Sequence, residues 1–514
     1  MHVSSERAVA AFSRAALRRS YPALGPTIIA LAVLAAGTVV AIHYSRTGLT
    51  LSHWDARAHL VVARRVFDNL VPSWQQIGAV WLPLPHVLNM LPVQVDAWYR
   101  SGASAIAISV ASMAVTCWAL ASFIRRITGS FIGGAAVGAL LMTNPNLLYL
   151  QSTPMTEPLL FATAALALVT TAAWVDRGAR EWPTAAGVSL ALACMTRYEA
   201  WLIGPALIAL AGAVLRRRGE SVAFAVRACM RVSVIPIAAI ALFTLNSWWT
   251  SGYWFVPRDF YVPENEALGQ RWLAWEQVRT GAIELSSNRF VRAGVVAMIF
   301  VALTSVFSRR RASLVLVLAL TAAAALPWYA YYRGHPERIR YGVPLVAAYS
   351  AAIGSAIGAL WAPLRLVAGA AVAVSLVRNA HALDRGAPVV AESQRDRENI
   401  AGRAAVTNYL AQHYDGSLVM MSMGSLGHYM HDLSAAGLYI RDFLHEGNGE
   451  VWPYAFAWPR PYAGWIVIEE RAEGGDALFR SAHRDPRWLE GYERVAAGGG
   501  VALYRRMFKT AGGT

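Results

Sequence analysis

The sequence predicts an all-α polytopic membrane protein of about eleven transmembrane helices, followed by a small C-terminal α/β domain. Of the 514 residues, 56% are apolar and only 15% are charged, a composition too apolar for a soluble globular protein. The 19 Trp and 20 Tyr residues suit aromatic belts at two membrane interfaces. The net charge is +15, and the Arg residues cluster beside the apolar runs. That placement indicates membrane topology, so we expect no nucleic-acid partner.

Each predicted span is an apolar run of roughly 20 residues or slightly fewer. The two runs around Arg197 are short for a span. The three cysteines lie inside or beside apolar runs, which indicates core positions and no disulfide framework. The predicted spans are 22–43, 102–124, 131–150, 158–175, 183–197, 200–215, 232–249, 292–307, 312–331, 342–361 and 364–378.

The orientation follows from the arginines. The first span has no signal-peptide cleavage pattern and follows a basic arm, so we expect a retained anchor with a cytoplasmic N-terminus. Alternation then places every short Arg-rich loop on the cytoplasmic side, as the positive-inside rule requires. These loops contain Arg125 and Arg126, 176–180, 216–218, 309–311 and Arg365.

The opposite face collects the long, chemically mixed segments. The sequence therefore predicts an integral protein of the bacterial inner membrane, with its active site and C-terminal domain extracytoplasmic. We divide it into a membrane domain, 1–378, and a C-terminal domain, 379–514. In the latter, 393–410 reads as an amphipathic helix. Strands are predicted at 417–422, 465–469 and 501–504, where short apolar runs are bounded by Gly and Asp.

The loop after the first span contains the most informative residues, Ser52-His53-Trp54-Asp55-Ala56-Arg57-Ala58-His59. Apolar residues recur at helical spacing from Asp55 to Leu70, which predicts a helix lying in the membrane interface. Residues 80–86 form a second, Pro-bounded element. Both elements could simply be a membrane-skimming scaffold. Asp55 is either a helix cap or a partly desolvated general base, and His53 and His59 flank it.

Further candidate residues lie on the same predicted face. Glu157 starts a span and is either a favourable helix N-terminal acid or a catalytic or metal-binding group. Arg197-Tyr198-Glu199 interrupts an apolar run, where charged groups usually face a cavity or one another.

Two longer loops complete this face. Loop 250–290 mixes aromatic and charged residues, including Arg258, and suits either a sugar-binding lid or an interfacial belt. Loop 332–341 carries Arg338 and Arg340 before Tyr341. These arginines are predicted to bind a phosphate, with ion pairing to neighbours such as Glu337 as the alternative.

One apparent motif is discounted. His428-Tyr429-Met430-His431-Asp432 could bind a metal, but solvent-facing histidines are the better expectation in a small α/β domain.

The stretch HWDARAHLVVARRVFDN, followed by WLPLPH, resembles the first external loop of GT-C glycosyltransferases, which include protein O-mannosyltransferases and lipid A aminoarabinose transferases. The resemblance implies that Asp55 corresponds to the catalytic aspartate and that Glu157 faces the active site. Many relatives have a second acid directly after the aspartate, where this chain has Ala56. His59, His86 or Glu157 could substitute, so a divalent metal stays possible and none is certain.

The leading prediction is therefore an inverting glycosyltransferase with a polyprenyl-phosphate sugar donor and a lipid, glycan or protein acceptor. Asp55 would be the general base, and the lipid phosphate would lie on arginines. No Gly-rich phosphate loop or DxD motif predicts a nucleotide donor. The alternative is a polytopic transporter or lipid flippase, although the chain shows no paired repeats. The predicted substrate-binding residues are His53, His59, His86, Arg197, Tyr198, Glu199, Arg258, Arg338, Arg340 and Tyr341.

Overall fold

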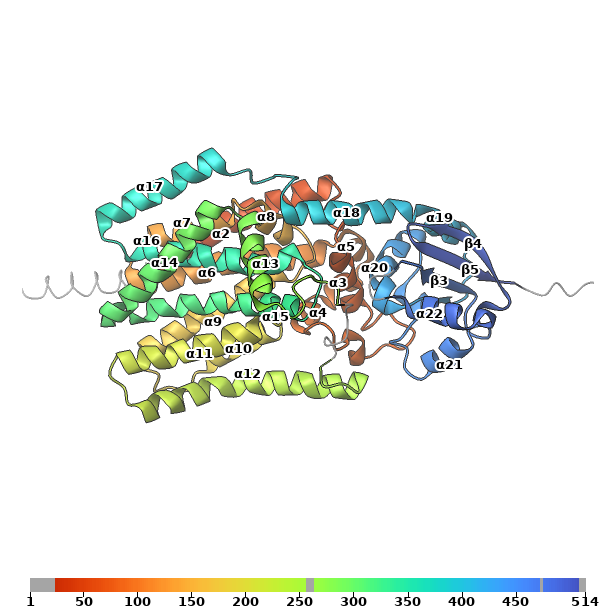
Figure 1. Ribbon diagram of the computed structural model, residues 1–514, viewed down its shortest axis with the longest axis horizontal. Coiled ribbons are helices and arrows are strands. Elements are labelled where there is room, and N and C mark those ends of the chain that lie inside the picture. Colours follow the sequence, from red (N-terminus) through yellow and green to blue (C-terminus); the bar gives the residue numbers. More distant parts are fainter. Residues whose placement is uncertain (1–23, 256–262, 472–474, 508–514) are drawn as a thin grey trace, which may run out of the picture.

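The computed structural model describes residues 24–255, 263–471 and 475–507. Figure 1 shows a bundle of long helices at one end of the molecule and a part with a small β-sheet at the other. The basic N-terminal arm and Arg258 lie outside the described residues.

Nine helices of the described chain are long and apolar enough to cross a membrane. They are α2 (Leu24–Arg46), α6 (Ala103–Thr128), α9 (Glu157–Asp176), α11 (Ala200–Arg217), α12 (Val222–Ser251), α14 (Asn288–Phe307), the continuous segment Arg309–Tyr332 made of η4 (Arg309–Ala324) and α15 (Ala325–Tyr332), the segment Ile339–Ala359 made of η5 (Ile339–Gly342) and α16 (Val343–Ala359), and α17 (Ala362–Asn379). The chain is thus an integral membrane protein, and its orientation stays a prediction.

Two of the eleven predicted spans are not single long helices. The run 131–150 is a bent pair, α7 (Phe131–Leu141) and α8 (Pro145–Gln151), with 79° between the two helices. The bend has a local cause, because Asn144 caps α8 with its side chain and Pro145 supplies the first helical residue. The run 183–197 contains only the 11-residue α10 (Thr184–Cys194), which is shorter than a full spanning helix. The segment nevertheless returns the chain from the Asp176 end of α9 to its Glu157 end, because Arg197 contacts Glu157. Counting the bent pair as one span gives ten.

The first external loop forms a series of short helices. These are α3 (Trp54–Arg64), η1 (Trp74–Ile77), α4 (Leu84–Asn89), η2 (Pro92–Gln94) and α5 (Asp96–Ser101). The predicted helix is present as α3, but it ends at Arg64, six residues before the predicted end at Leu70, and its apolar face does not lie on lipid. Leu60, Val61 and Ala63 are fully buried in one core with residues of the C-terminal sheet.

The C-terminal part carries a five-stranded mixed sheet with the order β2-β1-β3-β5-β4. The first three of these strands are parallel, and β5 runs antiparallel to both β3 and β4. The elements are α18 (Pro388–Gly402), α19 (Ala404–His413), β1 (Val419–Met420), α20 (Met423–Leu433), η6 (Ser434–Ala436), η7 (Ile440–Asp442), β2 (Phe443–Leu444), α21 (Val451–Ala457), β3 (Trp465–Glu469), α22 (Ala477–Arg484), η8 (Pro486–Leu489), β4 (Tyr492–Gly498) and β5 (Val501–Arg506).

The three predicted strands are present as β1, β3 and β5. All five residues of β3 are buried, as expected for a continuous apolar run between helices on both faces of a sheet. The predicted amphipathic helix is two helices, α18 and α19. Figure 1 shows α18 running from the bundle towards the sheet. The division at residue 379 stays a prediction, because α3 shares a core with the sheet.

Candidate active site

The start of α3 places Asp55 at the end of the bundle that faces the sheet. The cap of this helix is His53, whose Nδ1 accepts a hydrogen bond from the backbone N–H of Asp55 at 3.2 Å. The idea that Asp55 itself caps the helix is therefore wrong. Its side chain pairs instead with Arg340, which donates from Nη2 to Asp55 Oδ2.

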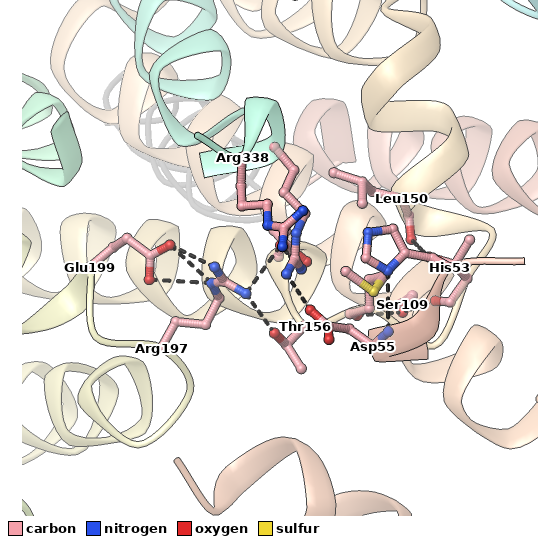
Figure 2. A network of polar contacts seen from close by, with 12 residues as sticks. His53, Asp55, Ser109, Leu150, Thr156, Arg197, Glu199 and Arg338 are labelled. Atoms are coloured by element: carbon pink, nitrogen blue, oxygen red, sulfur yellow. Dashed lines mark hydrogen bonds and ion pairs between the residues drawn. The ribbon is translucent and has the colours of Figure 1, made fainter. Parts of the chain in front are cut away.

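A line of alternating charges continues from this pair. Glu157 Oε1 lies 3.5 Å from Arg340 Nη1 and 3.1 Å from Arg197 Nη1. Arg197 also contacts Glu199 at 2.8 Å and donates to Thr156 Oγ1 at 2.9 Å. Figure 2 shows Arg197 between Glu199 and Thr156, with Arg338 and Asp55 in the same group. Four segments that are distant in sequence thus meet at one point, as the predicted topology requires.

This cluster is buried but not fully hydrogen-bonded. Glu157 is 0% exposed and its Oε2 has no hydrogen-bond partner, and neither has Arg340 Nε. A buried polar atom without a partner costs about 1–3 kcal/mol or more when charged, so such atoms usually mark a functional site. The side chain of Asp55 is 28% exposed, which makes it the most open acid of the group.

The charges fix the protonation states. Burial alone would raise the pKa of Asp55, but the Arg340 guanidinium outweighs burial and holds this pKa well below its usual range. Burial alone would lower the pKa of Arg197, yet Glu157 and Glu199 raise it overall. Asp55 is therefore an ionised carboxylate at neutral pH.

Two predicted histidines meet beside this cluster. His59 Nδ1 lies 3.0 Å from His86 Nε2, and the Trp81 ring contacts His59 with 4.1 Å between centroids and 41° between planes. Burial lowers the pKa of His59 to about 3, so it is neutral. His86 Nδ1 and Asn89 Oδ1 are buried without partners. Among the described residues, no group of three or more His, Cys, Asp or Glu side chains is placed to hold a metal ion.

The two predicted tyrosines lie at the edge of the site. The hydroxyl of Tyr198 donates to the carbonyl of Val80 at 3.0 Å and so fixes the Pro-bounded segment of the first loop. Tyr341 lies beside Arg340, whose guanidinium carbon is 5.4 Å from the ring centre. The substrate-binding role of both residues stays a prediction.

Two acids of the site were missed by the sequence analysis. Asp396 Oδ2 accepts the backbone N–H of Trp54 at 3.1 Å and lies 3.9 Å from His53 Nδ1. One turn earlier on α18, Glu392 has a buried Oε2 without a partner. Burial raises the pKa of Asp396 to about 6. The signal was the spacing of these acids, four residues apart at the start of the predicted amphipathic helix.

The expectation of solvent-facing histidines at 428 and 431 is wrong. Both are buried, at 5% and 6% exposure, because α20 packs between the sheet and α3. The His428 ring stacks on Trp54 with 4.9 Å between centroids and 8° between planes. His428 Nε2 also accepts from Arg403 Nη1 at 2.7 Å, whereas His431 Nε2 lies 3.0 Å from the carbonyl of Tyr99.

The structure resembles the crystal structure of ArnT from Cupriavidus metallidurans in the apo state, with a TM-score of 0.57. The similarity covers 93% of this chain and 99% of that chain at 12% sequence identity. The chain has the ArnT fold. The predicted resemblance to GT-C glycosyltransferases is thus confirmed for the fold. No protein-family model and no curated protein sequence matches the chain. At this identity the similarity to ArnT shows the fold alone.

Proposed function

We propose that the protein is an inverting glycosyltransferase that moves a sugar from a polyprenyl-phosphate donor to a lipid, glycan or protein acceptor outside the cytoplasm of a bacterial cell. The ArnT fold supports a lipid-linked donor. The observation that carries the proposal is the ionised, partly exposed Asp55 carboxylate beside the buried guanidinium of Arg340, whose Nε has no hydrogen-bond partner. A base and an anion site adjacent to each other are what this transfer needs.

The reaction is a single displacement. An acceptor O–H or N–H loses its proton to Asp55 as the acceptor atom bonds to the anomeric carbon. The bond from that carbon to the phosphate oxygen breaks, and its electron pair leaves with the polyprenyl phosphate. Attack opposite to the leaving group inverts the anomeric configuration. Arg340 and Arg197, assisted by Arg338, would stabilise the extra negative charge on the departing phosphate.

The pairing of Asp55 with Arg340 suggests how the base is activated. A carboxylate tied to a guanidinium is a weak base, because the ion pair holds its pKa low. A donor phosphate on Arg340 would compete with Asp55 for the same N–H groups. Asp55 would then regain basicity only when the donor is bound.

The test is transfer by the purified full-length protein. It is given radiolabelled polyprenyl-phosphate sugars and extracts of membrane lipid, glycan or protein acceptors, with and without a chelator. We expect label on one acceptor class and an inverted anomeric centre by NMR. Absence of transfer from every donor by folded protein, combined with movement of a lipid-linked sugar across vesicles, would support a flippase instead.

A further inference from the structure

Helix α3 presents two different faces. Residues three or four positions apart share a face of a helix, so Trp54, Arg57 and Val61 lie together. Asp55 and His59 lie together on another face. The second face points to the arginine cluster, where Asp55 pairs with Arg340. The first face points to the C-terminal part of the chain.

Every residue of that first face is held by the C-terminal part. The Trp54 ring is stacked on His428, and Arg57 pairs with Asp432. The side chain of Arg57 is 1% exposed, and Val61 is 0% exposed in the core shared with the sheet. The helix that carries Asp55 therefore packs against the C-terminal part.

Asp396 accepts a hydrogen bond from the first turn of this helix. The first N–H groups of a helix have no partner within it, and an acid is favourable there because of the helix dipole. His53 takes the N–H of Asp55, and Asp396 takes the N–H of Trp54 from 342 positions away in the sequence. The carboxylate thus fixes the residue immediately before Asp55.

Helix α18, which carries Asp396, is anchored at both ends. The backbone N–H of Val389 donates to Asn146 Oδ1 of the bundle at 3.0 Å. At the other end, Arg403 pairs with Glu469 of β3 and donates to His428. The Asp396 carboxylate is therefore held at a fixed position relative to both the bundle and the sheet.

We infer that Asp396 is a positioning residue, which sets the place of the Asp55 carboxylate relative to Arg340 through the first turn of α3. The C-terminal part is then a component of the active site and not a separate acceptor-binding module. This inference rests on the proposed function for its activity test, but its structural test does not need a substrate.

The activity test compares D396A, D396N and the control E398A in the full-length protein. Glu398 is exposed on the same helix and far from the α3 contact in the helix register. We expect D396A to lower kcat about 10- to 100-fold with the donor KM changed less than about 2-fold, because misplacing a reacting group acts on the chemical step. D396N keeps an oxygen for the Trp54 N–H but loses the negative charge, so kcat should fall only a few-fold. E398A should match the wild type.

The structural test is amide hydrogen exchange over residues 53–60 in detergent-solubilised protein. D396A should speed exchange about 10-fold at the α3 start, as expected for about 1.4 kcal/mol of lost local stability, and E398A should not. If D396A does not fold, H428A removes the ring stacked on Trp54, and the same effects are expected.

Unchanged kcat and unchanged exchange in D396A, or in H428A where D396A is unfolded, overturn the inference. A wild-type protein without transfer activity overturns the proposed function, and the exchange experiment still decides the role of Asp396. A D396A variant that loses donor binding and kcat together contradicts a positioning role.

Discussion

Helix α9 has an acid at each end, and the two acids differ in their hydrogen bonds and in their exposure to solvent. Glu157 is its first residue and Asp176 its last, about 30 Å apart along a 20-residue helix. Each acid contacts two arginines. Glu157 contacts Arg197 and Arg340, whereas Asp176 contacts Arg126 and Arg218.

The hydrogen bonds of the two acids are not alike. Asp176 Oδ1 accepts from Arg218 at 2.6 Å and from Ser313 at 2.7 Å, and its Oδ2 accepts from Arg126 at 2.9 Å. Glu157 shares Oε1 between its two arginines, and Oε2 has no partner. Asp176 is 20% exposed and Glu157 is 0% exposed.

The two arginine–carboxylate clusters therefore differ in how much of their hydrogen-bonding capacity is used within the protein. The Asp176 cluster is satisfied by its own residues and neutralises an acid at a helix C-terminus, where the dipole disfavours it. The Glu157 cluster keeps unused hydrogen-bonding capacity in a buried place, which a substrate anion and its counter-charges can use. We therefore expect the Asp176 cluster to serve the fold and the Glu157 cluster to serve the proposed reaction.

The largest expected effect comes from the arginines. R340A should reduce transfer at least about 1,000-fold, because Arg340 pairs with both Asp55 and Glu157 and is proposed to hold the phosphate. R218A, its counterpart at the other end of α9, should leave kcat/KM within about 2-fold. Steady-state transfer assays of R340A and R218A measure both effects. Equal losses of activity in the two variants would show that the two clusters do not differ in function.

A smaller effect is expected at Glu157. E157Q keeps the shape of the side chain and removes its charge, so transfer should fall about 100-fold through disturbed arginine geometry. The melting temperature should fall only modestly, because Gln keeps an oxygen for the contacts of Oε1 with Arg197 and Arg340 and Oε2 has no partner to lose. A melting scan beside the activity assay checks both statements, and a folded, fully active E157Q would place Glu157 outside the chemistry.

The reverse pattern is expected at Asp176. D176N weakens charged hydrogen bonds from Arg126, Arg218 and Ser313, so stability should fall by about 1–3 kcal/mol. Activity per folded molecule should equal that of the wild type. Chemical unfolding of the solubilised protein measures the first quantity. A loss of activity without a loss of stability would show that this end of α9 also has a functional role.

The smallest effect is a pH dependence. The groups that face Asp396 are His53, Asp55, Arg57 and Glu392. Burial raises the pKa of Asp396 from 3.8 to about 6, so the carboxylate that caps α3 is ionised above this pH and protonated below it. We expect kcat to fall a few-fold below pH 6 and D396N to remove this limb. His53 and His59 add no limb near pH 6.5, because burial lowers the pKa of each to about 3.

Ionisation of Asp396 should lower the stability of the fold, whereas it should raise kcat. A folded-state pKa above the unfolded value means that folding favours the protonated form. The contribution of Asp396 to the free energy of unfolding therefore falls as pH rises from about 4 to about 6. Glu469 beside Arg403 also has a pKa raised by burial, to about 6, so the comparison with D396N is needed for the assignment. If kcat and stability change with pH in the same direction, and D396N shows the same changes, Asp396 is not the group that titrates.

Much of the site could be predicted from the sequence. Charges that interrupt an apolar run are costly in a bilayer, so Arg197 and Glu199 were expected to face a cavity or each other. They do pair, and Glu157, Arg340 and Asp55 adjoin them in one cluster. Periodicity located α3 to within one residue of its start. These predictions could be made because each rests on a pattern within a single loop or span.

The rest depends on contacts between distant segments. No local pattern shows that Trp54 meets His428 or that Asp396 caps a helix 342 positions earlier. The apolar face of α3 looked membrane-facing, because a stripe that contacts a sheet and a stripe that contacts lipid have the same spacing. Ala56, where the resemblance to GT-C glycosyltransferases implies a second acid, is 0% exposed in the bundle core, so packing occupies this position.

The most direct test of the central claim is transfer by D55N. Asn is nearly isosteric with Asp and keeps an oxygen for Arg340, so the fold and the donor affinity should survive while the base is lost. We expect purified D55N to transfer no detectable label and to keep the melting temperature of the wild type. Transfer at the wild-type rate by folded D55N would contradict this expectation.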